Sequence, residues 1–94
     1  MKAITVQIGN SDDKLSQKKW SMFVGEIDTE IRNATSQIHF TGYSIPSAPW
    51  QNAAWVFVVE NEKTKEWLMR RVAEIREMYK QDSVAWTEGE TSFL

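Results

Sequence analysis

Alternating apolar and polar positions open the chain and predict a β-strand. In residues 3–8, Ala-Ile-Thr-Val-Gln-Ile, the side chains of Ile4, Val6 and Ile8 would share one side, which is the period of a half-buried strand. Residues 9–13, Gly-Asn-Ser-Asp-Asp, suit turns and compete with regular backbone ladders. We therefore expect a first strand over residues 3–8 and a polar loop directly after it.

A helix is predicted next, with Ser16 as its N-cap. Behind this serine the apolar residues recur every three or four positions, which is the spacing of one helix face. Gly25 lowers the helix propensity locally, and residues 33–36, Asn-Ala-Thr-Ser, end the pattern. The apolar face consists of Trp20, Phe23, Val24, Ile27 and Ile31.

Two strands follow the first helix. Residues 37–44 alternate, with Ile38 and Phe40 on one side. A loop over residues 45–52 contains two prolines, which interrupt regular structure. Residues 53–59, Ala-Ala-Trp-Val-Phe-Val-Val, are apolar on both sides. Such a segment is typical of a central strand that is covered on both faces.

A second helix and a last strand complete the pattern. Asn61 is placed to cap the helix, and charged residues surround the apolar stripe of this helix. The last strand would begin at Ser83, and Gly89 favours a bend or bulge within it. The apolar stripe of the second helix consists of Leu68, Val72, Ile75 and Tyr79.

The predicted order of elements is strand, helix, strand, strand, helix, strand. This order is the α+β arrangement of ferredoxin-like folds, βαββαβ. By analogy with that fold, we expect a four-stranded antiparallel sheet in the order fourth, first, third, second, with both helices on one face. A chain of 94 residues fits one such domain, over residues 1–94.

Three polar loops, residues 9–14, 45–52 and 81–83, would then meet at one end of the sheet. An indole beside side-chain amides is a platform for a flat hydrogen-bonding ligand such as a nucleobase, and it would suit a protein partner equally well. The alternative is that Trp50 folds back to close the core. The residues expected to bind a ligand at this end are Asn10, Asp12, Asp13, Trp50, Gln51, Asn52, Gln81 and Asp82.

The second face of the sheet would carry no helix. Because the third predicted strand is apolar on both sides, either the side with Trp55 and Phe57 or the side with Val56 and Val58 needs another cover. Uncovered apolar surfaces of this kind mark partner or ligand sites. We expect a homodimer that packs two such faces together, and docking on a different protein is the alternative.

Charge and composition exclude several classes of function. The chain has 11 basic and 13 acidic residues, a net charge of −2, which argues against broad nucleic-acid binding. It contains no cysteine, which excludes disulfides, thiolate metal sites and a cysteine nucleophile. No apolar run approaches the ~20 residues of a membrane span, and the N-terminus does not read as a signal peptide. We therefore expect a cytoplasmic protein that does not bind to membranes.

Few residues are candidates for chemistry. Asp12, Asp13 and Asp82 could together bind a hard cation such as Mg²⁺, but acidic residues in a turn before a helix also suit the helix dipole. His39 is the only histidine, and nothing places a serine beside it as in a catalytic triad. We expect a non-catalytic binding protein without metal or cofactor. The alternative is a small enzyme, either metal-assisted or built as a dimeric α+β barrel.

Several segments resemble a group of small proteins from actinobacteria and their phages. These segments are QIGNSDDKL from Gln7, PWQNA from Pro49, QDSVAW from Gln81, and the pair Phe93-Leu94. The resemblance implies a phage origin and a location in the host cytoplasm. For a phage protein of this size, it also implies a role against host defence, through binding a protein or sequestering a nucleotide signal.

Overall fold

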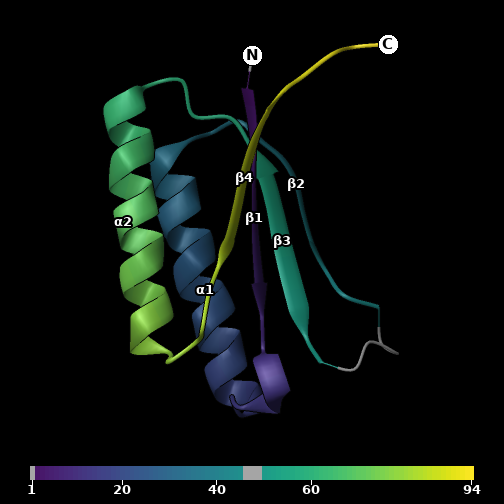
Figure 1. Ribbon diagram of the computed structural model, residues 1–94, viewed down its shortest axis with the longest axis vertical. Coiled ribbons are helices and arrows are strands. Elements are labelled where there is room, and N and C mark those ends of the chain that lie inside the picture. Colours follow the sequence, from purple (N-terminus) through teal and green to yellow (C-terminus); the bar gives the residue numbers. More distant parts are fainter. Residues whose placement is uncertain (1, 46–49) are drawn as a thin grey trace.

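Two helices pack against one face of a four-stranded antiparallel sheet (Figure 1). The computed structural model describes residues 2–45 and 50–94, and for Ser11 it describes the backbone alone. The sheet order β2-β3-β1-β4 and the βαββαβ sequence of elements confirm the predicted ferredoxin-like α+β fold. The elements are β1 Lys2–Gly9, a 3₁₀ turn η1 Ser11–Asp13, α1 Gln17–Ala34, β2 Ile38–Tyr43, β3 Asn52–Phe57, α2 Glu62–Met78 and β4 Ala85–Glu90.

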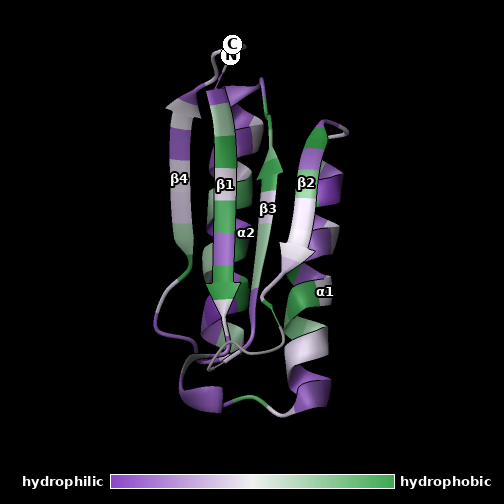
Figure 2. Cartoon of the chain, turned by 90° about the vertical axis from the view of Figure 1, so that its right-hand side faces the viewer, coloured by the Kyte–Doolittle hydropathy of each residue, from purple (hydrophilic) through white to green (hydrophobic). Residues whose placement is uncertain are grey.

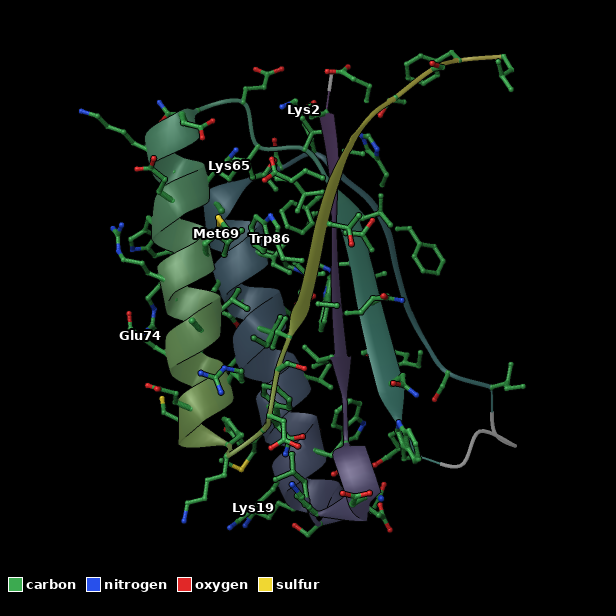
Figure 3. The ribbon with its side chains drawn as sticks, in the orientation of Figure 1. Lys2, Lys19, Lys65, Met69, Glu74 and Trp86 are labelled. Atoms are coloured by element: carbon green, nitrogen blue, oxygen red, sulfur yellow. The ribbon has the colours of Figure 1, made fainter. Side chains whose placement is uncertain are left out.

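The first strand lies in the middle of the sheet and fixes the register of its neighbours. In β1, Val6 pairs with Trp55 of β3 on one side and with Trp86 of β4 on the other. Paired residues share a sheet face, so the buried Val6 places both indoles on the helix-covered face. Figure 3 shows Trp86 between β4 and the helices.

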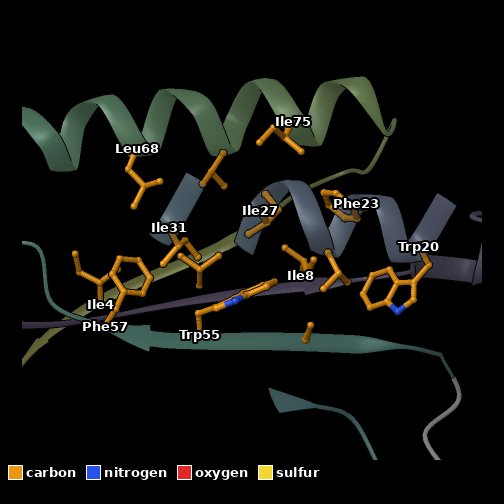
Figure 4. Close-up of a cluster of buried hydrophobic side chains, with 14 of the residues drawn as sticks. Ile4, Ile8, Trp20, Phe23, Ile27, Ile31, Trp55, Phe57, Leu68 and Ile75 are labelled. Carbon is orange, nitrogen blue, oxygen red and sulfur yellow. The ribbon is translucent and has the colours of Figure 1, made fainter. Parts of the chain in front are cut away.

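The hydrophobic core lies between this sheet face and the two helices (Figure 4). The predicted faces of the first strand and of the first helix are buried in full, as are three of the four residues predicted for the second helix. The fourth, Tyr79, is half-buried and stacks on Phe23 with ring centroids 5.0 Å apart. The core consists of Ile4, Val6, Ile8, Leu15, Trp20, Phe23, Val24, Ile27, Ile31, Ala53, Trp55, Phe57, Leu68, Val72 and Ile75.

A carboxylate at the edge of the core holds the largest buried side chain. The indole N–H of Trp55 donates to Asp28 Oδ1 at 3.0 Å, and Arg32 Nε donates to Asp28 Oδ2 at 2.8 Å. Burial by itself raises the pKa of the Asp28 carboxyl, but the hydrogen bonds from Arg32 and Trp55 outweigh it and leave that pKa below its ordinary value. The buried indole donor is therefore satisfied, as buried polar groups require.

Both helices begin at the predicted caps. Ser16 Oγ accepts from the backbone N–H of Lys19 at 3.2 Å, and Asn61 Oδ1 accepts from that of Thr64 at 3.1 Å. Each cap satisfies one of the backbone donors that a helix N-terminus leaves unpaired. These local signals therefore identified both helix starts correctly.

Two details of the predicted strands are wrong. A register shift between Ile38 and Phe40 in β2 breaks the alternation, so that Ile38 pairs with the buried Phe57 whereas Phe40 pairs with Val56 on the opposite face. The pattern in residues 37–44 could not reveal this bulge, because it depends on the pairing with β3. Of the bend or bulge expected at Gly89, the bulge is absent, since β4 pairs with β1 in regular register through that residue.

Among the residues that the strand pairing assigns to it, the face without helices carries no charged side chain. We call it the open face, and Figure 2 views the molecule from this side. Trp55 and Phe57 point to the helices, so the β3 side chains that need another cover are Ala54 and Val56, while Val58 follows the strand and is buried. The open face consists of Ala3, Thr5, Gln7, Gly9, Phe40, Gly42, Asn52, Ala54, Val56, Ala85, Thr87 and Gly89.

The C-terminus of α2 has a left-handed residue that is not glycine. Lys80 has φ 54°, its N–H donates to Glu77 O at 3.0 Å, and the N–H of Gln81 donates to Arg76 O at 3.1 Å. This pair of bonds is the Schellman helix end, whose left-handed position favours glycine. A side chain at a left-handed φ costs about 1–2 kcal/mol.

Replacing Lys80 with glycine should therefore stabilise the protein. We expect Lys80→Gly to raise the free energy of unfolding by about 0.5–1 kcal/mol, or Tm by about 3–6 °C, after allowance for the more flexible unfolded chain. Lys80→Ala is the matched control, because it removes the same side chain and keeps the strain. Calorimetry that finds equal Tm values for the two variants would contradict this account.

Candidate functional site

The three predicted loops do meet at one end of the sheet. The backbone N–H of Asn10 donates to Gln51 O at 2.8 Å, which joins the loop after β1 to the segment before β3. Lys14 Nζ lies 3.7 Å from Asp82 Oδ2, which brings in the segment before β4. Residues 46–49 of the predicted β2–β3 loop lie outside the described residues.

Asn10 closes the loop between β1 and α1. Its side chain is fully buried, its Nδ2 donates to Leu15 O at 2.9 Å, and its Oδ1 accepts from Leu15 N at 2.8 Å. Longer contacts of 3.3 Å reach Asp13 Oδ1 and Gln51 Oε1. Both polar atoms of the Asn10 amide are thus used within the protein, so this residue shapes the end of the sheet from inside.

Two more of the predicted amides also link segments of the chain. Gln51 exchanges hydrogen bonds with the first residue of α1, Gln17, at 2.9 and 3.2 Å. Gln81 is buried, its Nε2 donates to Tyr79 O at 3.2 Å, and its backbone O accepts from Arg76 Nη1 at 3.0 Å. Among the described residues, Gln81 Oε1 has no hydrogen-bond partner. These glutamines hold the start of α1 and the end of α2 in place.

The three aspartates of this end are exposed. Asp12 and Asp13 have φ values of 56° and 55°, a left-handed conformation that aspartate tolerates better than most residues. Asp82 contacts Lys14, as described above. Within residues 2–45 and 50–94, no three His, Cys, Asp or Glu side chains lie close enough together to hold a metal ion. Two adjacent aspartates therefore suit the backbone conformation of this turn.

The remaining two predicted residues, Trp50 and Asn52, line a hollow on the open face. The hollow has a volume of about 400 Å³, within the range of small-ligand pockets. It occupies the end of the open face where the three loops meet. Its described lining consists of Gln7, Ile8, Gly9, Phe40, Gly42, Tyr43, Ser44, Trp50, Asn52, Ala53, Ala54, Ser83 and Ala85.

Small side chains create this hollow. One row of paired residues crosses all four strands in the order Gly42, Ala54, Gln7 and Ala85. Side chains stand roughly perpendicular to a sheet, so a row with one glycine and two alanines leaves a depression. The next row begins with Phe40 and is taller, which gives the hollow one of its walls.

Two glycines let larger side chains lie close to the backbone at the rim. A Cβ atom at Gly42 would come within 2.6 Å of the Phe40 ring, and a Cβ atom at Gly9 within 2.9 Å of Asn52 Oδ1. Both distances are too short for a real side chain, so the absence of a Cβ is what permits these positions. Gly42 therefore leaves room for the Phe40 ring of its own strand, and Gly9 leaves room for the Asn52 amide of the neighbouring strand.

The chemistry of the lining is aromatic and neutral. Among its described residues are exposed rings from Phe40, Tyr43 and Trp50, and no Asp, Glu, Lys, Arg or His. Trp50 is 44% exposed and therefore does not close the core, which was the alternative prediction for it. The exposed carboxamide of Gln7 supplies both a donor and an acceptor at the floor.

Sequence reasoning missed most of the lining. Phe40 was predicted to share a side with Ile38, which the register contradicts, and the open-face positions Gln7, Gly42, Ala54 and Ala85 received no functional interpretation. A signal was present, because three small residues stand at outward positions of different strands. Only the register shows that these positions are adjacent.

Comparisons with known proteins give the fold and no family. No family model and no curated protein matches the chain. Three solved structures with TM-scores of 0.57–0.59 cover 97–99% of this chain and 92–97% of their own. They are the de novo designed protein Foldit4 (13% identity), a hydroxynitrile lyase from Passiflora edulis (8%) and a dimeric ferredoxin-like protein of unknown function from Thermobifida fusca YX (4%). At these identities the likeness concerns the fold alone. In the part of the chain that is described, neither helix is long and apolar enough to cross a membrane.

Removing the Asn10 amide should destabilise the fold. In Asn10→Ala the buried N–H and C=O of Leu15 lose their partners, and we expect the free energy of unfolding to fall by about 2–4 kcal/mol. Asp13→Asn is the control, because it changes an exposed residue beside Asn10 and asparagine tolerates the left-handed backbone. We expect it to change the free energy of unfolding by no more than about 0.5 kcal/mol. Urea unfolding measures both. If Asn10→Ala were as stable as the wild type, the loop-closing role would be wrong.

Proposed function

We propose that this protein is a non-catalytic binding protein that holds a small, flat, uncharged ligand in the hollow of its open face and works as a homodimer. The observation that carries the proposal is the uncharged open face with an aromatic-rimmed hollow of about 400 Å³ at one end. Folded proteins keep such neutral, partly apolar surface for ligands and partners.

The lining favours a ring system that can both stack and hydrogen bond. The Trp50 indole and the Phe40 ring provide aromatic contact, and the Gln7 amide can pair with a neighbouring donor and acceptor, as glutamine does with adenine. A charged group would lose its hydration in the hollow without meeting an opposite charge among the described lining residues. The base of a nucleotide therefore fits the hollow, and its phosphate would remain outside.

A second copy of the chain is the cover that suits the rest of the open face. In a twofold interface a surface meets itself, so any charge near the axis faces a like charge. The open face avoids this conflict because the residues that the strand pairing assigns to it carry no charged side chain. The ferredoxin-like protein from T. fusca, which is described as dimeric, shows that a protein of this fold can form dimers.

The same lining supports binding over catalysis. Tyr43 is the one ionisable side chain among the described lining residues, so proton transfer at neutral pH has no evident donor or base there. The hydroxynitrile lyase shares the fold at 8% identity, which transfers no catalytic residue. The phage origin, the role against host defence and the cytoplasmic location stay predictions of the sequence.

A lysine in the middle of the open face should break the dimer. Thr5 pairs with Val56 and Thr87 at its centre, and an unpaired buried charge there should weaken association roughly hundredfold or more. We expect the wild type to sediment as a dimer at micromolar concentration and Thr5→Lys as a folded monomer. Ser21→Lys, on the exposed surface of α1, is the control and should remain dimeric. A monomeric wild type would refute the dimer.

Ligand binding can be tested by comparing neutral heterocyclic compounds with a charged nucleotide. We expect saturation-transfer NMR to detect adenosine, uridine or nicotinamide on the wild type, and AMP no more strongly than adenosine. Trp50→Ala should weaken the binding about tenfold, since stacking on an aromatic ring is worth ~1–3 kcal/mol, whereas Trp50→Phe keeps most of it. Ala54→Phe, which fills the floor, should abolish the signal. Equal binding by wild type and Ala54→Phe would exclude the hollow as the site.

A further inference from the structure

Exposed apolar side chains gather on the side of the open face. Of the nine large ones among the described residues, three are methionines on the helices, Met22, Met69 and Met78. The other six belong to two groups at the two ends of the sheet. Phe40, Tyr43 and Trp50 line the hollow, Ile45 follows β2 at the same end, and Phe93 and Leu94 follow β4.

These two groups lie at opposite ends of the strands. Glu90 pairs with Lys2 at the start of β1, so residues 91–94 continue beyond that end. The hollow lies at the other end, around Gly9 and Ala85. In Figure 1 the C-terminal segment leaves the sheet and leans away from the helices, to the open-face side. One end of the face is therefore concave, and the other carries a projecting apolar segment.

The sheet alone offers little surface to a dimer. Strands about 4.8 Å apart and a rise of about 3.3 Å per residue give four six-residue strands an outline of roughly 400 Å². A standard interface buries about 800 Å² per partner. The projecting ends would therefore add contact area to a pair of open faces.

Shape decides how two copies would face each other. If the strands of the two copies ran with the same ends together, the two hollows would face each other, and so would the two C-terminal segments. If the ends are reversed, each projecting segment meets the partner's hollow, and the twofold axis repeats this contact. Residues 91–94, Thr-Ser-Phe-Leu, carry no charged side chain, and the described lining of the hollow carries none either.

We propose that two copies stack with their open faces together and their strand ends reversed, so that residues 91–94 of each copy close over the hollow of the other. This inference rests on the homodimer of the proposed function and adds that the binding site is completed in trans. The ring of Phe93, which is 82% exposed in the single chain, then packs at the aromatic rim around Trp50 and Tyr43. The ligand is enclosed between the two copies.

Disulfide crosslinking tests the arrangement, because the native chain has no cysteine. Two single variants, Ser92→Cys and Ile45→Cys, are prepared separately, mixed and oxidised. A bond requires Cα atoms within about 7 Å, so a 92–45 crosslink between different chains reports reversed ends. We expect the mixture to give a crosslinked dimer and each variant alone to give little. Mass spectrometry of the digested band identifies the joined peptides.

The apolar segment should also contribute to dimer affinity. We expect Phe93→Ser to raise the dimer dissociation constant at least about tenfold, since it removes a large buried ring. Met78→Ser is the control, because it removes a large exposed side chain from the helix surface. Sedimentation velocity over a concentration series measures both constants.

The outcomes separate this inference from the proposed function. A wild type that sediments as a monomer overturns both the homodimer and the closure in trans. If the wild type is a dimer but each single variant crosslinks to a second copy of itself, the strand ends are aligned. That result overturns the closure in trans and leaves the homodimer standing. The closure in trans is also overturned if the wild type is a dimer but the mixture forms no 92–45 bond, or if Phe93→Ser leaves the dimer dissociation constant unchanged.

Discussion

Two helices can cover only one face of a four-stranded sheet, and the rest of the structure follows from this constraint. The helix-covered face takes the large apolar side chains, including Trp55 and Phe57, and Glu88 at its edge pairs with Lys65 of α2 at 3.0 Å. The other face has no helix to cover it. The chain resolves this with small and neutral residues, which tolerate water in the monomer and desolvate at low cost when covered.

The hollow on that face is a consequence of pairing register. Gly42, Ala54 and Ala85 are unremarkable within their own strands, and they form a floor only because β1 and β3 place them in one row. The bulge in β2 then moves Phe40 to the same face, where Gly42 leaves room for its ring. The proposed ligand surface and the proposed dimer surface thus share one face, which is why the proposed site and the proposed partner depend on each other.

The polar end of the sheet illustrates what residue type can and cannot reveal. The concentration of amides and carboxylates correctly indicated segments that meet in space. It could not distinguish an amide that ties down a loop from one that faces a ligand, because both need the same donor and acceptor. Asn10 and Gln81 are buried and bonded to backbone, whereas Trp50 and Asn52 line the hollow. Burial, which depends on the whole fold, made that distinction.

The sequence by itself determined the elements, the two helix caps, the buried helix stripes and, through their order, the ferredoxin-like fold. These features depend on neighbours within a few positions along the chain, so periodicity and capping residues express them directly. Tertiary structure alone decided which side of β3 faces the helices, where β2 bulges, and which small residues adjoin to form the hollow. Each of these depends on side chains from strands far apart in sequence, whose register is set by packing across the sheet.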